Sequence, residues 1–112
     1  MKIITLCGST KFKKEFEEVN EALTLLGHVI LSVGVFVHSK ELEIKPSQKV
    51  LLDEIHKKKI DLSDEIFVID VNGYIGSSTR SEIEYAKLKD KKINYFSDNN
   101  CSYNFSLKNI SN

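Results

Sequence analysis

Residues 65–71 read Glu-Ile-Phe-Val-Ile-Asp-Val, an apolar, β-branched run that is the strongest strand signal in the chain. The turn-rich loop 72–78, Asn-Gly-Tyr-Ile-Gly-Ser-Ser, follows it, and the pattern then predicts a helix from about Thr79 to Lys89. Before the strand, a helical pattern begins at Pro46, the only proline in the chain. A buried strand between two helices is typical of an α/β fold with a parallel sheet.

The first third of the chain repeats this alternation of strand and helix. Residues 2–7 predict a first strand, which ends at a Gly-Ser-Thr turn. Gly27 stands where the cap of the next helix is expected, and the apolar run 29–37 predicts a second strand, buried on both faces. A last short strand is predicted at residues 93–96.

Two helices are predicted from apolar residues that recur on one face. In the first helix these residues lie three or four positions apart: Phe12, Phe16, Val19, Leu23 and Leu26. In the helix that begins at Pro46, the apolar face carries Leu52, Ile55 and Leu62, with Leu51 beside it. These faces are expected to pack against the sheet.

The whole pattern predicts a three-layer, doubly wound, flavodoxin- or Rossmann-like parallel sheet of four to five strands. Residues 1–96 form the predicted α/β domain, and residues 97–112 form a polar C-terminal tail. Ligands of such sheets bind at the carboxyl ends of the strands. If the first and third strands are neighbours, the loops Gly8–Lys11 and Asp70–Ser78 face each other there.

The composition limits the classes of partner and the cellular locations expected for this chain. The 112 residues include 16 basic and 16 acidic ones, so the net charge is zero, which argues against binding to nucleic acid. No apolar run is long enough to span a membrane, and the N-terminal segment is too short for a signal peptide, so a cytoplasmic location is expected. Cys7 and Cys101 have no metal-ligand spacing and are expected to be reduced. Cys7 is interpreted as a small buried hydrophobe rather than a nucleophile.

Glu82 has two interpretations. In the first turn of a helix, the free amide groups would favour its ionised form, and a charged carboxylate can attack an anomeric carbon. The segment Thr79-Arg80-Ser81-Glu82 also matches a capping box, in which Thr79 caps the helix and Glu82 reaches back to it. Spacing alone favours the capping box.

Other candidate residues carry weaker signals. Gly76, Ser77 and Ser78 precede a helix and allow a sugar or phosphate to approach closely. His56 lies on a helix beside the basic run 57–59, where a solvent-facing histidine is the ordinary interpretation. Arg80 is the only arginine in the chain.

From Lys2 to about Phe96, the chain resembles the nucleoside 2-deoxyribosyltransferase-like superfamily, which includes the 2′-deoxynucleoside 5′-phosphate N-hydrolases. The resemblance is carried by the Gly8-Ser9 turn, by the helix that leads through Asp61 into the strand at 65–71, and by a Gly/Ser loop that enters Glu-Ile-Glu-Tyr-Ala at 82–86. It implies that Glu82 is the nucleophile and that capping of the helix start is at most a second role.

The resemblance also implies roles for other residues. Ser9 would hold a phosphate with Lys11, which replaces the arginine of the family. His56 stands where the family usually has an aspartate, eight residues before Asp64, and would protonate the departing base. The polar residue that the family has six positions before the glutamate falls on Gly76, so Ser77 or Ser78 would replace it. The full substrate-binding set is Gly8, Ser9, Lys11, Asp70, Gly76, Ser77, Ser78 and Arg80.

The implied activity is cleavage or transfer at the N-glycosidic bond of a 2′-deoxynucleoside or its 5′-monophosphate. No metal or redox cofactor is implied. Relatives complete each active site with a neighbouring subunit, so a homodimer is expected, with Tyr103 and Asn104 of the tail as candidate contributors. The alternative is a nucleotide-binding sensor or interaction module on the same scaffold, without turnover.

Overall fold

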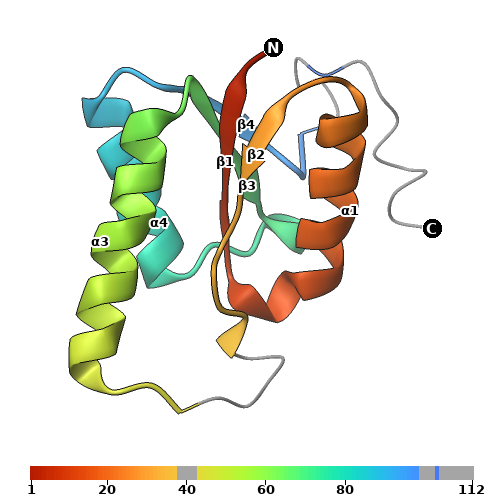
Figure 1. Ribbon diagram of the computed structural model, residues 1–112. Coiled ribbons are helices and arrows are strands. Elements are labelled where there is room, and N and C mark those ends of the chain that lie inside the picture. Colours follow the sequence, from red (N-terminus) through yellow and green to blue (C-terminus); the bar gives the residue numbers. More distant parts are fainter. Residues whose placement is uncertain (38–42, 99–102, 104–112) are drawn as a thin grey trace.

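The computed structural model describes residues 1–37, 43–98 and 103, and these residues form an α/β fold around one parallel sheet (Figure 1). The sheet has the order β2-β1-β3-β4. The strands are β1 (Ile3–Gly8), β2 (Val29–Leu31), β3 (Glu65–Ile69) and β4 (Lys92–Tyr95). The helices are α1 (Lys13–Leu25), α3 (Pro46–Leu62) and α4 (Ser77–Leu88), with short 3-10 turns η1 (Thr10–Phe12) and η2 (Val71–Gly73).

The helices cover both faces of the sheet, which confirms the predicted three-layer, flavodoxin- or Rossmann-like architecture. Helix α1 lies on one face, and α3 and α4 lie side by side on the other (Figure 1). Alternate side chains of β1 and β3 therefore enter two separate cores. The core under α1 contains Ile4, Leu6, Phe16, Val19, Leu23, Phe67 and Ile69. The core under α3 and α4 contains Cys7, Ile60, Ile66, Val68, Ile83 and Ala86.

Strands β1 and β3 are neighbours in the sheet. This is the condition under which the loops Gly8–Lys11 and Asp70–Ser78 were expected to face each other. Gly8 at the end of β1 pairs in register with Ile69 at the end of β3. The backbones approach closely there: a Cβ on Gly8 would lie 2.8 Å from the Ile69 carbonyl oxygen, and the φ of Gly8 is +157°. Glycine is therefore required at the point where the chain leaves β1 for the site.

Two parts of the predicted packing are wrong. The second strand spans only Val29–Leu31 and is partly exposed, because β2 is an edge strand that pairs with β1 alone. Leu26 lies beyond the end of α1 and is half exposed. The inner stripe of α1, formed by Phe16, Val19 and Leu23, is buried as predicted.

Helix α3 packs with a different face from the predicted one. Its buried residues are His56 and Ile60, whereas Leu51, Ile55 and Leu62 are largely exposed. The apolar residues of α3 are scattered around the helix, so its sequence pattern does not fix which side meets the sheet.

None of the described helices combines the length and apolar character needed to cross a membrane. Tyr103 is the one described residue of the segment 99–112, and its ring packs against the rings of His28 and Phe67 of its own chain. Asn104 lies outside the described residues.

Candidate active site

A cavity of about 420 Å³ opens at the carboxyl ends of β1 and β3, between the face of α3 and the start of α4. This volume lies within the usual range for small-molecule sites. Its lining includes seven of the residues singled out from the sequence: Gly8, Ser9, His56, Gly76, Ser77, Ser78 and Glu82. The β1 turn and the start of α4, far apart in the chain, therefore meet around one space.

Glu82 enters this cavity from the second turn of α4. The helix begins at Ser77 with Gly76 as its N-cap, and no side chain caps it, so the predicted capping box at Thr79 does not form. Thr79 is instead a buried residue inside the helix. The capping interpretation of Glu82 is wrong, because the helix starts two residues earlier than the sequence suggested.

The charge state of Glu82 also differs from the expectation of a carboxylate held ionised by the helix terminus. Burial and, next to it, the nearby charge of Asp53 raise its pKa from 4.5 to about 7, while Lys49 acts in the opposite direction. Desolvation therefore outweighs the amide groups at the helix start, which lie more than a turn away. At neutral pH both the protonated and the ionised form of this carboxyl are therefore populated.

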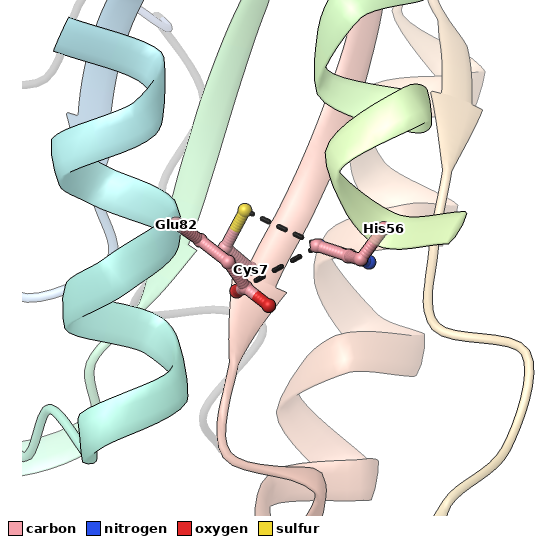
Figure 2. A group of neighbouring side chains, drawn as sticks. All are labelled: Cys7, His56 and Glu82. Atoms are coloured by element: carbon pink, nitrogen blue, oxygen red, sulfur yellow. Dashed lines mark hydrogen bonds and ion pairs between the residues drawn. The ribbon is translucent and has the colours of Figure 1, made fainter. Parts of the chain in front are cut away.

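His56 reaches Glu82 from α3, as Figure 2 shows. Its Nε2 lies 3.8 Å from Glu82 Oε1 and 3.4 Å from the Cys7 sulfur. The side chain is buried, not solvent-facing, because the inner face of α3 carries it toward the end of β1. Burial, with the charge of Lys59, lowers the pKa of His56 to about 4, so its imidazole is neutral at pH 7 and is not a preformed acid.

Cys7 is the third member of this group and was missed as a site residue. It is fully buried, as interpreted from the sequence, but its sulfur also contacts the His56 ring rather than core atoms alone. Burial and the adjacent Glu82 raise the pKa of the thiol well above its ordinary value, which makes it a poor nucleophile. Its position directly before Gly8, at the carboxyl end of a strand, was the available signal.

Three predicted binding residues do not line the cavity. The Lys11 ammonium lies 3.5 Å from the centre of the Tyr74 ring, in a cation–π contact. Asp70 is buried and accepts hydrogen bonds from the backbone and hydroxyl of Ser97, which ties the end of β3 to the segment after β4. Arg80 is exposed on α4.

The inner face of α3 adds lining residues that were not singled out from the sequence. Lys49 donates to Asp53 Oδ1 at 2.6 Å and to Ser78 Oγ at 3.1 Å, so it connects α3 to the start of α4. Lys49, Asp53 and His56 follow one another at helical spacing, and this pattern could have identified the face. Tyr74, from the loop after β3, also lines the cavity.

The segment of the family resemblance around Asp61 has a structural role. The Tyr85 hydroxyl donates to Asp61 Oδ1 at 2.6 Å and joins the end of α3 to α4. Both residues lie outside the cavity lining. This contact sets the spacing of the two helices that carry His56 and Glu82.

Comparison of the chain with protein-family models and with curated proteins gives no match. The functional argument therefore depends on the cavity and on the side chains that enter it.

Proposed function

We propose that this chain cleaves the N-glycosidic bond of a 2′-deoxynucleoside or its 5′-monophosphate, with Glu82 as the nucleophile. The observation that supports this most directly is the position of Glu82. Its carboxyl enters the 420 Å³ cavity between the Gly8-Ser9 turn and the Gly76–Ser78 segment. A sugar held between these two glycine-containing segments would present its anomeric carbon to the carboxylate.

The reaction would proceed through a covalent glycosyl-enzyme. The ionised Glu82 oxygen forms a bond to C1′, the C1′–N bond breaks, and its electron pair goes to the base, which takes up a proton from solvent. Water then releases the sugar, or a second base accepts it, so hydrolysis and transfer share the first step. Neutral His56 orients the Glu82 carboxyl and hydrogen-bonds the departing base.

Ser9, Ser77 and Ser78 are assigned to the sugar or 5′-phosphate, since all three line the same cavity. Ser9 already caps the turn after β1, where its hydroxyl accepts from the Lys11 amide at 3.4 Å. Backbone amides at the start of α4 supply further donors for an anion. The proposal includes a cytoplasmic location and a homodimer.

The first test measures free base, by chromatography, after incubation with a panel of deoxynucleosides and deoxynucleoside monophosphates. Glu82→Gln and Glu82→Ala should reduce release by at least about 1,000-fold, equivalent to about 4 kcal/mol of transition-state stabilisation. Glu84→Gln is the matched control, because Glu84 lies on the same helix but is exposed.

Equal activity of Glu82→Gln and the wild type would exclude Glu82 as the nucleophile. Thermal stabilisation by a nucleotide without any release of base would instead indicate the non-catalytic binding module.

A further inference from the structure

Cys7, His56 and Glu82 bring three different kinds of metal-ligand atom together, each from a different element (Figure 2). His56 and Glu82 line the cavity, and Cys7 is fully buried beside them. The Cys7 Sγ, one His56 ring nitrogen and one Glu82 carboxylate oxygen all lie within 4.8 Å of one another. We propose that these residues form a binding site for one zinc-class divalent cation. This site goes beyond the glycosidic chemistry and does not depend on it.

The separations of His56 from Cys7 and from Glu82 are close to those of tetrahedral coordination. Bonds of about 2.3 Å to sulfur and about 2.0–2.1 Å to nitrogen and oxygen place neighbouring ligand atoms about 3.3–3.6 Å apart. The sulfur of Cys7 lies 3.4 Å from His56 Nε2, which in turn lies 3.8 Å from Glu82 Oε1. The remaining adjustment falls on the Glu82 side chain, whose three rotatable bonds allow it without movement of β1 or α3.

The chemistry of the donors selects the class of ion. A thiolate, an imidazole and a carboxylate together favour Zn²⁺ or Co²⁺ over Mg²⁺ and Ca²⁺, which prefer all-oxygen sites. On binding, the Cys7 S–H bond breaks, a sulfur–metal bond forms and the proton leaves to solvent. The thiolate and carboxylate then balance the two charges of the ion, which favours a buried site.

The surroundings supply the support that metal-ligating side chains require. The ring of His56 is buried on the inner face of α3, and this packing restricts the orientation of a ligating histidine. Lys49 and Lys59 of α3, whose charges act on Glu82 and His56, have other partners: Lys49 binds Asp53 at 2.6 Å, and Lys59 donates to the Ser32 carbonyl at 2.7 Å. Three protein ligands leave the fourth tetrahedral position open to the cavity.

Metal and substrate would compete for one carboxylate. The Glu82 oxygen that attacks C1′ in the proposed reaction is a ligand of the ion here, so an equimolar zinc-class cation should abolish base release. Chelator-treated protein should show the full activity.

The test is a titration of the chelator-treated full chain with Co²⁺, followed by displacement with Zn²⁺. We expect one ion per chain, a thiolate-to-cobalt charge-transfer band in the near ultraviolet, and visible bands of four-coordinate intensity. Cys7→Ser should remove the charge-transfer band, and His56→Gln should weaken binding by more than about tenfold.

Cys101→Ser and His28→Asn are the matched controls, and both should bind as the wild type does. The chain has two cysteines, so a charge-transfer band that persists in Cys101→Ser identifies Cys7 even if Cys7→Ser fails to fold. Absence of the band from wild-type protein, or its loss in Cys101→Ser, would overturn the site. These spectra do not measure activity, so they separate failure of the metal site from failure of the glycosidic proposal.

Discussion

Glu82 and His56 lie side by side in the cavity, and burial moves their pKa values in opposite directions. The carboxyl rises from 4.5 to about 7, and the imidazole falls from 6.5 to about 4. Both shifts have the same cause, since removal from water penalises the charged form of either group. At pH 7 the His56 imidazole is therefore neutral, whereas the Glu82 carboxyl is present in both its protonated and its ionised form.

These shifts predict that Glu82 and His56 each make the free energy of unfolding depend on pH. Substitution of one residue at a time separates the two contributions. The Glu82 contribution is present below pH 4.5 and is lost as the pH rises through about 7, whereas the His56 contribution is present above pH 6.5 and is lost as the pH falls through about 4. Each is worth about 3 kcal/mol, so they nearly cancel in the wild type between pH 4.5 and 6.5.

In Glu82→Gln, only the His56 contribution remains, so the free energy of unfolding should rise with pH by about 3 kcal/mol relative to the wild type. In His56→Gln it should fall with pH by a similar amount. Urea unfolding of chelator-treated proteins at pH 4.5–7 measures both, with Glu84→Gln as the control. Two profiles parallel to that of the wild type would show that burial does not shift these groups.

At the scale of elements, the site depends on the close approach of β1 to β3. Gly8 pairs with Ile69 at the last register position, and the chain must turn there without a side chain. The Gly8-Ser9 turn and the loop that leads to Gly76–Ser78 start from these strand ends, and both segments line the cavity. Any change that separates the strands therefore moves the Gly8-Ser9 turn away from Glu82.

Gly8→Ala should destabilise the protein by about 1–3 kcal/mol, because the new Cβ would lie 2.8 Å from a backbone oxygen at a positive φ. Gly34→Ala is the matched control: a Cβ there meets no atom within 4 Å, so the change should stay within about 0.5 kcal/mol. Urea denaturation of the two variants gives the comparison. A Gly8→Ala protein as stable as the wild type would show that the strand ends can separate without cost.

At the scale of the whole molecule, helix α3 has two working faces. Its inner face supplies Ile60 to the core, and it supplies Lys49, Asp53 and His56 to the cavity. Its outer side exposes apolar residues, among them Val50, Leu51 and Leu62, each more than half exposed. A second copy of the chain that covers this side would account for its apolar character.

Sedimentation at micromolar concentration should therefore give twice the 12.8 kDa mass of the chain. Leu51→Lys should shift the protein toward monomer, because a charge would be buried in the proposed interface. Glu21→Lys is the control, because Glu21 is exposed on α1, which covers the other face of the sheet. A wild-type monomer would remove the homodimer from the proposal.

The sequence alone predicted those strands and helices whose buried side follows from local apolar periodicity. The apolar runs of β1 and β3 and the Phe16–Leu23 stripe of α1 predicted both the strands and the layer that covers them. The Gly/Ser loops identified the edge of the sheet where the cavity lies. Glu82 was selected as the candidate nucleophile from the family resemblance, because its spacing alone favoured a helix cap. These features can be predicted because the structure of each segment follows from residues close to it in the sequence.

Tertiary structure alone decided the rest. Cys7 and His56 are 49 residues apart in sequence, and their contact exists because α3 crosses the end of β1 with its mixed polar face inward. The start of α4 at Ser77, not Thr79, places Glu82 beyond the reach of the helix terminus and leaves desolvation to set its pKa. Desolvation depends on everything that packs around a group, and that environment is assembled only when the layers meet.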